Sequence, residues 1–461
     1  MKKVSFETLF EIPLRNGVTK PKKIRGKGYK MVNMGELFSY PIINNISMDR
    51  APLTELEEKN SLLENYDLLF ARQSLVRSGA GQCSIFISDD EKVCFESHII
   101  RCRLDKNKAN PLFYFYLFRS NIGRNIMDTI IEQGAGASGI RGSDLSKLMI
   151  PYIDIKIQND IAEKLFSLDQ KIELNTQTNQ TLEQIAQGIF KHWFIDFAPV
   201  HAKANALARG ETTEQAELAA MACLSGKTVE KITALKTQDP TAYHQLQQTA
   251  AAFPSEFVET EMGEVPKGWA GFTIKDCCKN LYNGGTPRRK IDSYWNKGTI
   301  PWLSSGEVCN NNILIKSKEF ITEEGLAKSA AKIVPVNSTL VAIYASPTAG
   351  KCSLCAFETT TNQAVCSLVP IENFQYFNYL NLKTKELYFA NQAVGSAQQN
   401  ISKQIIEETS SLKPNNEVIN SFNLLVEPIF KKWISNLNEN LSLSNTRDTL
   451  LPKLLNGEVK L

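Results

Sequence analysis

The stretch IAEKLFSLDQKIELNTQTNQTLEQIAQGIFKHW, residues 161 to 193, decides the fold. Ten of its residues are separated by four and three positions in turn: Ile161, Leu165, Leu168, Ile172, Asn175, Asn179, Leu182, Ala186, Ile189 and Trp193. This spacing is typical of the apolar seam of a long helix in a coiled coil. At 1.5 Å per residue, such a helix would extend about 50 Å.

A second seam follows with every position shifted by 261 residues: Phe422, Val426, Ile429, Trp433, Asn436, Asn440, Leu443, Arg447, Leu450 and Leu454. Both seams place two Asn in their fifth and sixth layers. Antiparallel pairing with aligned centres would make Asn175 face Asn440 and Asn179 face Asn436, and buried Asn pairs can fix the register of a helix pair. The alternative is that each helix packs on its own module alone. Pro428 predicts that the second helix starts or kinks there.

The rest of the chain also contains a repeat. Three pairs of segments occur in the same order with offsets of about 260 to 270 residues: AGQCSIF (80–86) and AGKCSLC (349–355), MVNMGE (31–36) and WLSSGE (302–307), and GASGIRGSDLSKLMIP (136–151) and GSAQQNISKQIIEETSSLKP (395–414). Short β-like runs between Gly, Pro and Asn turns precede helical segments in each copy. We therefore predict an α/β (α+β) fold in which two globular modules are separated by two long antiparallel helices, with an internal pseudo-twofold repeat.

These patterns predict five parts of the chain. They are a first module (1–155), a central helix (156–197), a helical linker or insertion rich in Ala and Gln (198–262), a second module (263–415) and a C-terminal helix (416–461).

Composition restricts the class of protein. The chain has 461 residues with 43% apolar content and only ten Cys, so we expect most Cys to be small buried residues rather than disulfide partners. Cys352 and Cys355 have C-x2-C spacing, but no second pair follows at zinc-finger distance, so we expect no metal. No apolar run of about 18 residues occurs, which predicts a cytoplasmic protein with no membrane partner.

Motifs for catalysis are weak or missing. GAGASG (134–139) satisfies G-x-G-x-x-G, but the stretch before it has a helical period, so a loop is the better interpretation than a nucleotide site. NPLF (110–113) lacks the second Pro of the base-holding element of amino-methyltransferases. The chain has no G-x-x-x-x-G-K-[ST], H-E-x-x-H or G-x-S-x-G motif. We expect a protein without a catalytic site or a cofactor of its own.

Polar loops between the strands are the candidates for DNA contact. Residues 15–30 hold seven Lys or Arg and no acid, and residues 288–290 form a second basic cluster. Local basic loops on a nearly neutral chain fit a partner with phosphates better than a general polycation does, and solvated surface charge is an equal alternative for either cluster alone. Arg and Gln can read base edges, while Lys, Ser and Thr can hold phosphates. The candidates are Lys20, Lys22, Lys23, Arg25, Arg72, Gln73, Arg77, Gln82, Arg141, Thr286, Arg288, Arg289, Lys290, Ser304, Ser305, Ser346, Thr348 and Lys351.

Several motifs together resemble the specificity (S) subunit of type I restriction-modification systems. GGTPRRKIDSYWNKGTIPWLSSGEV (284–308) is similar to the start of its target recognition domain, and FPSEFVETEMGEVPKGW (253–269) to the lead-in. IAQGIFKHWFIDFAPV (185–200) is similar to its central region, and RDTLLPKLLNGEV (447–459) to its end. The first module departs from this pattern, since MVNMGELFSYP replaces the usual IPWLSSGEV.

The resemblance implies a non-catalytic subunit that recognises a bipartite asymmetric target in double-stranded DNA. It also implies a complex for defence against foreign DNA, with two methyltransferase subunits and two restriction subunits that translocate DNA. S-adenosylmethionine, ATP and Mg would bind only to those partners. Two other classes stay open: a two-lobed interaction scaffold on a coiled coil without DNA specificity, and a self-contained methyltransferase or nuclease, which the missing motifs disfavour.

Overall fold

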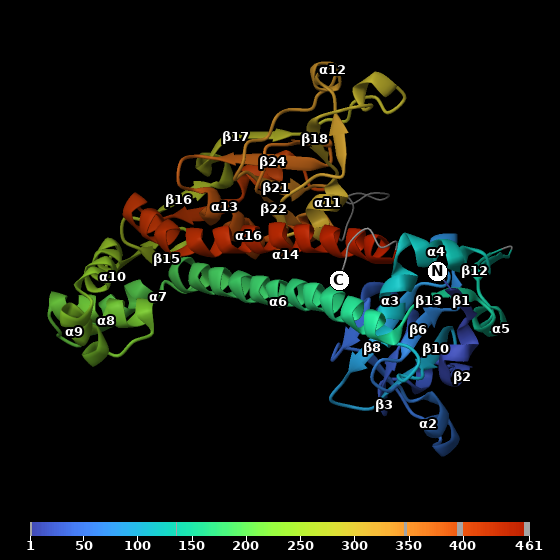
Figure 1. The fold of residues 1–461 in the computed structure, drawn as a ribbon. Helices are drawn as coiled ribbons and strands as arrows, with labels where there is room; N and C mark the ends of the chain where they lie inside the picture. The colour runs from blue at the N-terminus through green and yellow to red at the C-terminus, as the bar shows by residue number, and fades with distance from the viewer. Residues whose placement is uncertain (1, 135, 345–347, 394–399, 456–461) are drawn as a thin grey trace. The chain divides into compact units, whose positions relative to one another are not determined.

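The computed structural model describes residues 2–134, 136–344, 348–393 and 400–455. It divides into two compact units (Figure 1). The first unit is formed by residues 1–174 and 439–461, and the second by residues 175–438. Each unit holds one copy of the repeated module, so the repeat in the sequence is also a repeat of compact structure.

The core of the first unit is a five-stranded sheet with the order β2-β10-β6-β8-β4. Its strands are β2 (Phe10–Asn16), β10 (Ile99–Leu104), β6 (Leu68–Ala71), β8 (Cys83–Ser88) and β4 (Ile42–Asn44). All neighbours pair antiparallel except β4 and β8, which pair parallel. Strands β6 and β8 are almost entirely apolar and buried, as expected for central strands covered on both faces.

The second unit has the same sheet, with the order β17-β24-β21-β22-β19. Its strands are β17 (Cys278–Asn283), β24 (Val365–Pro370), β21 (Thr339–Ala342), β22 (Cys352–Cys355) and β19 (Ile313–Leu314). Again the neighbours are antiparallel except for the last pair, β19 and β22, which is parallel. The two sheets therefore share order and strand direction throughout, which confirms the predicted repeat.

Smaller sheets repeat as well. Strand β3 (Tyr29–Val32) pairs antiparallel with β5 (Asp49–Ala51) and parallel with β9 (Val93–Phe95). In the second unit β18 (Ile300–Leu303) pairs in the same two ways with β20 (Glu319–Ile321) and β23 (Thr360–Thr361). The antiparallel pair β1 (Lys2–Ser5) and β13 (Met149–Tyr152) corresponds to β16 (Ala270–Thr273) and β25 (Ser410–Lys413).

The repeated words AGQCS and AGKCS form the same junction in both modules. Gly81 and Gly350 have φ of 71° and 92°, in the left-handed region that favours glycine. Each following Ser is buried at the start of the next strand, where Ser84 Oγ donates to Leu37 O at 2.8 Å and Ser353 Oγ donates to Val308 O at 2.6 Å. The accepting carbonyls belong to the short helices α1 (Met34–Ser39) and α11 (Ser305–Asn310). The repeated word is therefore a structural junction.

The same two helices explain the second repeated word, MVNMGE and WLSSGE. Glu36 Oε2 accepts a hydrogen bond from Asn33 N at 2.8 Å, and Glu307 Oε2 accepts one from Ser304 N at 3.0 Å. Both carboxylates thus reach back to the residue that begins the helix, which is one half of a capping box. In each module this segment contains the end of one strand and the beginning of one helix.

Helices cover one face of each main sheet: α3 (Pro111–Arg119) and α4 (Asn121–Asp128) in the first unit, α13 (Gln375–Thr384) and α14 (Glu386–Gln392) in the second. The NPLF motif begins α3, because the Asn110 side chain accepts from Phe113 N and Pro111 occupies the first helical turn. The motif is thus a helix start. Short helices complete the modules: α2 (Glu55–Ser61), α5 (Gly142–Ser146), α12 (Glu323–Ala327) and α15 (Lys403–Glu408).

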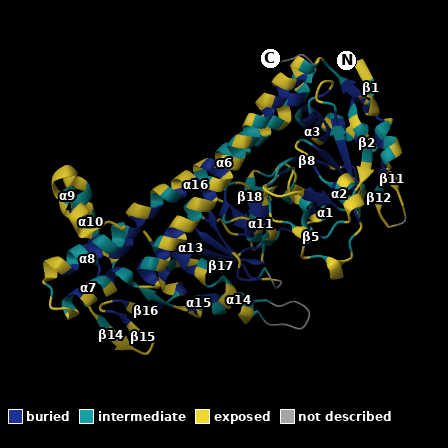
Figure 2. Ribbon diagram, turned by 90° about the horizontal axis from the view of Figure 1, so that it is seen from below, coloured by how far each residue is buried: buried dark blue, intermediate teal, exposed yellow. Residues whose placement is uncertain are grey.

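Two 40-residue helices, α6 (Ile155–Phe194) and α16 (Asn416–Leu455), pack together (Figures 1 and 2). In the second unit Trp193 and Phe194 lie against Phe422, with ring centroids 5.8 and 5.0 Å apart. Farther along, Asn436 Nδ2 donates to Asn179 Oδ1 at 2.9 Å, and both side chains are buried. Residue numbers fall along α6 as those of their partners rise along α16, so the helices are antiparallel. The contact between Asn179 and Asn436 is one of the two Asn pairs that the seams predict.

Another part of the two seams lies in the first unit. Asn440 Nδ2 donates to the backbone oxygen of Ile172 at 3.3 Å. Arg447 Nη1 bonds Asp169 Oδ1 at 2.6 Å, and Tyr116 on α3 donates to Asp169 Oδ2 at 2.7 Å. Burial and the neighbouring Asp169 raise the pKa of the Tyr116 phenol. Asn175 and Asn440, the other predicted pair, belong to different compact units.

Pro428 does not start α16. The helix begins at Asn416, where the Asn415 side chain accepts from Val418 N, and it continues through Pro428. Val426 and Phe430 on either side of it are buried in the core of the second unit, and this tertiary packing outweighs the poor helix propensity of Pro.

Four helices form the insertion after α6: α7 (Ala198–Ala208), α8 (Thr213–Ser225), α9 (Val229–Gln238) and α10 (Pro240–Ala252). Buried Lys203 Nζ donates to Phe253 O at 2.7 Å, which ties α7 to the end of α10. A hairpin of β14 (Phe257–Thr260) and β15 (Gly263–Pro266) then leads into the second module.

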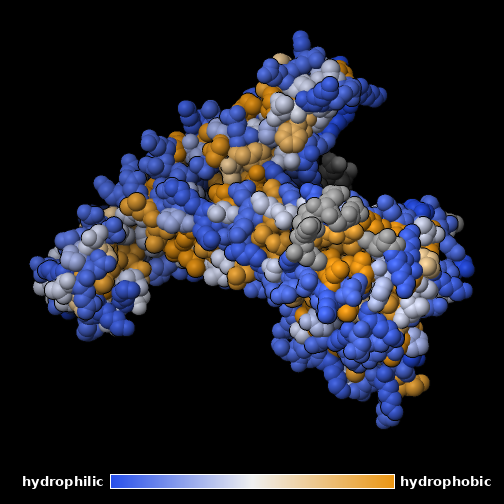
Figure 3. Space-filling model, in the orientation of Figure 1, coloured by the Kyte–Doolittle hydropathy of each residue, from blue (hydrophilic) through white to orange (hydrophobic). Residues whose placement is uncertain are grey.

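Most Cys are buried, as predicted: Cys83, Cys94, Cys102, Cys277, Cys352, Cys355 and Cys366. Burial raises the pKa of the Cys355 thiol to about 12, so this C-x2-C residue stays a neutral thiol near pH 7. Among the described residues, none of the helices combines the length and the apolar content that a membrane span requires. The visible surface of α8 and α9 is mostly hydrophilic (Figure 3).

The buried Asn pair leads to a stability prediction. Asn436→Ala removes the donor to Asn179 and leaves a buried amide without this partner, so the free energy of unfolding should fall by about 1–3 kcal/mol. Exposed Asn438 on the same helix is the matched control. Asn438→Ala should change the free energy of unfolding by less than about 0.5 kcal/mol. Urea denaturation measures both. Equal effects would show that the pair carries no special energy.

Candidate nucleic-acid interface

The loop of residues 72–82 joins β6 to β8 and contains four of the candidate residues. Gln73, Arg77 and Gln82 are exposed, and Arg72 is half-buried. Strand β7 (Gln73–Ser74) holds the start of the loop by pairing with β12 (Ser138–Gly139), which in turn pairs with β11 (Glu132–Gln133). The structure therefore places Arg72, Gln73 and Arg77 on one loop whose base is a small sheet.

Arg124 on α4 holds the far end of this loop. Its Nη1 donates to Ala80 O at 2.7 Å and its Nη2 donates to Arg77 O at 2.8 Å. The Arg77 guanidinium donates in turn to Asp128 O at 3.1 Å but stays exposed. Sequence patterns did not single out Arg124, because it lies on a helix 44 residues beyond the carbonyl it binds. Its two bonds to carbonyls make it a support for the loop rather than a reader of bases.

The basic stretch 15–30 divides into bound and accessible cations. Lys20 forms an ion pair with Glu57 at 2.7 Å, and its side chain is only 11% exposed. Arg25 donates to Lys20 O and Asn33 Oδ1, both at 2.8 Å. In contrast, Lys22 and Lys23 are exposed on a 3-10 turn. Lys20 and Arg25 thus make internal contacts that shape the loop, whereas Lys22 and Lys23 expose their ammonium groups to solvent.

The second basic cluster, residues 288–290, is also divided. Arg289 makes two hydrogen bonds to Glu319, at 2.5 and 2.9 Å, and its guanidinium lies 3.8 Å from the ring centroid of Trp295 and 4.7 Å from that of Trp302. All three residues of this cluster are exposed, the Arg289 side chain to 49%. The planar Arg289 side chain therefore clamps the loop to β18 and β20, while its two neighbours remain accessible to phosphates.

Three further candidates of the second module, Thr286, Ser304 and Thr348, have partners in the module. Thr286 donates to Gln363 Oε1. Ser304 caps α11, and Ser305 is half-buried in the first turn of that helix. Thr348 Oγ1 donates to Tyr344 O at 3.3 Å. Ser346 lies outside the described residues. In the first module Arg141 forms an exposed ion pair with Glu132 at 2.7 Å.

Lys351, the counterpart of Gln82, is paired. Its Nζ lies 2.8 Å from Glu386 Oε2, and Lys383 Nζ lies 2.8 Å from Glu386 Oε1. Burial alone would raise the pKa of the Glu386 carboxyl, but the hydrogen bonds from Lys351 and Lys383 outweigh it and hold this pKa below its usual value. Glu386 therefore stays ionised and neutralises part of the Lys351 charge, whereas Gln82 is an exposed neutral side chain.

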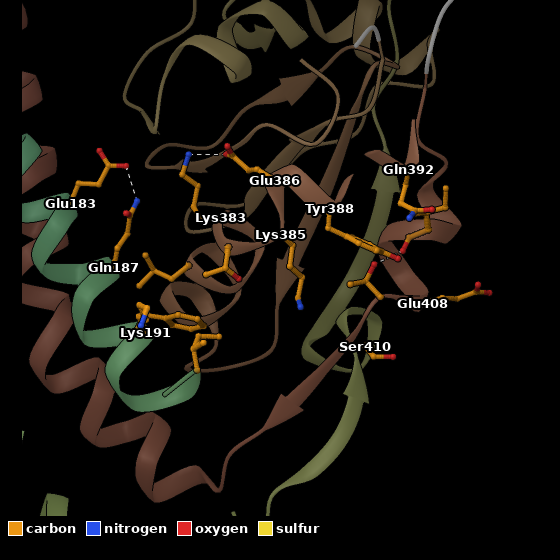
Figure 4. A pocket seen from close by; sticks show the side chains of 16 residues that line it. Glu183, Gln187, Lys191, Lys383, Lys385, Glu386, Tyr388, Gln392, Glu408 and Ser410 are labelled. Carbon is orange, nitrogen blue, oxygen red and sulfur yellow. Dashed lines mark hydrogen bonds and ion pairs between the residues drawn. The ribbon is translucent and has the colours of Figure 1, made fainter. Parts of the chain in front are cut away.

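A cleft of about 1110 Å³ lies beside this network in the second unit, between α6, α13, α14 and α15 (Figure 4). Glu183 on α6 accepts from Asn312 Nδ2 at 2.8 Å, and Lys383 donates to Asn312 Oδ1 at 2.9 Å. Burial raises the pKa of Glu183. Glu183 and Glu386 are thus both held by hydrogen bonds beside the cleft.

The described residues contain no group of three or more His, Cys, Asp or Glu that could hold a metal ion. What the geometry supports is a pair of loop surfaces, one on each module, with exposed cations and amides on a rigid base.

Comparisons with known proteins agree on one family. A model described as the type I restriction modification DNA specificity domain matches residues 1–184 and 266–410. The chain is 35% identical over 403 residues to the type I restriction enzyme HindI specificity subunit of Haemophilus influenzae, covering 85% of this chain and 86% of that protein. It is 25% identical to the MjaIX specificity subunit of Methanocaldococcus jannaschii, covering 76% and 69%. A solved S subunit from M. genitalium, 15% identical, has the same fold with a TM-score of 0.53 over 98% of this chain and 95% of that one.

The Arg289 clamp leads to a testable contrast with its neighbour. Arg289→Ala removes the Glu319 pair and both ring contacts and should lower the free energy of unfolding by about 1 kcal/mol, a modest value because the pair is partly exposed. Arg289→Lys should recover only part of this, since an ammonium cannot stack or bond in a fork. Arg288→Ala is the control and should have little effect. Tryptophan fluorescence during urea denaturation reads out the change, and equal losses at both positions would contradict the clamp.

Proposed function

Because the chain belongs to the family of type I restriction-modification DNA specificity subunits, we propose that its two modules read the two halves of an asymmetric bipartite target in double-stranded DNA. The family is non-catalytic, and this chain is a specificity subunit with two target recognition regions. The observation that carries the proposal is the pair of sheets with identical strand order and direction, whose connecting loops carry different side chains. One scaffold with two different loop surfaces suits two different half-sites.

Within each module, exposed cations supply affinity and loop side chains supply discrimination. Lys22, Lys23, Arg288 and Lys290 face solvent and can neutralise phosphates, which is a sequence-independent contribution. Arg72, Gln73 and Arg77 lie on a supported loop, and Arg and Gln form paired hydrogen bonds with guanine and adenine edges in the major groove. The two long helices would set the unspecified spacing between the half-sites, about one helical turn or 34 Å apart.

We further propose that the chain assembles with two methyltransferase and two restriction subunits in the cytoplasm. The repeat gives each module its own stretch of the helix pair, so two copies of one partner can use equivalent surfaces. An adenine must leave the base stack before it is methylated, and the pocket for it would belong to the methyltransferase partner together with S-adenosylmethionine. ATP and Mg would serve the restriction subunits.

Exchanging the first module tests the division of labour. Replacing residues 1–155 by those of a relative with another target should change one half of the methylated sequence and leave the other half unchanged. Exchange of residues 263–415 is the matched control and should change the opposite half. Long-read sequencing of methylated adenines in the host genome measures both. A change in both halves after either exchange would overturn the proposal.

The exposed lysines give a second test, with the purified chain and its methyltransferase partner on duplex DNA. Changing Lys22 and Lys23 together to Gln should weaken binding to all sequences alike and reduce the slope of log affinity against log salt by about 2, one for each lost phosphate contact. Lys20→Gln, which removes the internal pair with Glu57, should lower stability and leave the slope nearly unchanged. Binding that is absent at every salt concentration would favour the scaffold without DNA specificity.

A further inference from the structure

The loop of residues 72–82 carries two exposed apolar side chains at its tip. Leu75 is 89% exposed and Val76 is 60% exposed. Leu75 is the most exposed large apolar residue among those that the structure describes. A single exposed Leu is ordinary on a protein surface. This one is distinguished by its place at the tip of a supported loop between Gln73 and Arg77.

The tip has a fixed shape. Val76 N donates to Ser74 Oγ at 3.2 Å, and Gly79 N donates to Val76 O at 3.0 Å. Gly79 packs so closely that a Cβ there would lie 2.2 Å from Ser74 Oγ. With the two bonds from Arg124 described above, the loop presents Leu75 to solvent on a preorganised turn. A preorganised side chain loses little conformational entropy when it binds.

The charge around Leu75 indicates the chemical class of its binding partner. Arg72 and Arg77 give this loop a positive charge, and among the described residues no ion pair neutralises either of them. A positive loop with an apolar tip is complementary to a polyanion that also presents an apolar group. In the DNA major groove that group is the 5-methyl of thymine, the one apolar group on a base edge.

Spacing along the loop agrees with this assignment. In extended chain the rise is about 3.3 Å per residue, so Gln73 and Leu75 are separated by at most about 7 Å. This is close to two base-pair steps of about 3.4 Å. Gln73 can therefore bond one base edge while Leu75 contacts another base pair nearby.

The corresponding loop of the second module differs in length and sequence. Residues 343–351 are two residues fewer than residues 72–82, and their sequence IYASPTAGK contains no Leu or Val. A difference confined to one copy of an otherwise repeated scaffold fits a role in target choice. Resting on the function proposed above, we infer that Leu75 is a specificity-determining residue that recognises a thymine in the half-site of the first module by packing on its 5-methyl group.

Deoxyuridine substitution tests this contact directly, because it removes the 5-methyl and leaves the base pair intact. The full chain in complex with its methyltransferase partner is bound to a duplex that contains its methylated sequence, and each thymine of the first module's half is replaced in turn. That half contains a thymine because its methylated adenine is paired with one. At one position the replacement should weaken binding about fourfold, the factor for burying one methyl-sized group.

Leu75→Ala should weaken binding to the thymine duplex by a similar factor. The affinity of this variant should no longer change when deoxyuridine replaces the thymine. Leu75→Met, which keeps an apolar side chain, is the matched control and should retain most of the response. Thymines in the second module's half give an internal control, since neither variant should alter their effect. The exposure of Leu75 makes misfolding an improbable cause of any change, and urea denaturation of each variant checks this.

Two results would overturn the inference and leave the proposed function standing. In one, every deoxyuridine is tolerated while binding stays sequence-specific. In the other, Leu75→Ala releases the methyltransferase partner at unchanged DNA affinity, which would make the tip a protein contact. Loss of sequence-specific binding by the unmodified complex would instead contradict the proposed function itself.

Discussion

The packing of α6 against α16 is the interaction on which both modules depend. Phe190, Phe194 and Phe422 belong to the same buried cluster as α13 and the sheet of the second module. Leu165 and Leu451 belong to the same cluster as α3 and the sheet of the first. Each stretch of the helix pair is thus part of a module's core, and burial of this apolar surface favours the folding of both. A module without its stretch of helix would expose that face to water.

The two modules meet their helices with different chemistry. Tyr116 in NPLFYFY and Tyr379 in NFQYFNY occupy matching places. Tyr116 donates to Asp169, which also accepts from Arg447, whereas Tyr379 lies against Phe430 with ring centroids 5.8 Å apart. The shift of 261 residues relates Phe430 to Asp169 and Ala186 to Arg447. Moving either module to the other stretch would remove the acceptor from Tyr116 or bury Asp169 against an aromatic cluster. Because unpaired buried polar groups are costly, this difference favours each module on its own stretch.

The patterns that depend on spacing could be predicted, and those that depend on distant partners could not. Seam spacing identified the long helices and the Asn179–Asn436 contact, and the repeated words identified two equal modules. The sequence could not show that Lys20 and Arg289 are bound, because Glu57 and Glu319 lie 37 and 30 residues away and reach them only through tertiary structure. Ser304 looked like a phosphate contact, although its spacing to Glu307 is also that of a capping box. Local residue types therefore overestimated the number of free side chains in the candidate loops for DNA contact.

Recognition can change in this fold without a change in its core. Gly81 and Gly350 supply the backbone conformation, and Ser84 and Ser353 tie each following strand to a helix, so the junction depends on residues that point inward. The side chains between them, such as Gln82 and Lys351, point to solvent or to one carboxylate. Surface substitutions away from caps and buried networks cost little stability. A loop of this kind can exchange its side chains and even its length, as residues 72–82 and 343–351 do, while the sheet beneath keeps the same strand order.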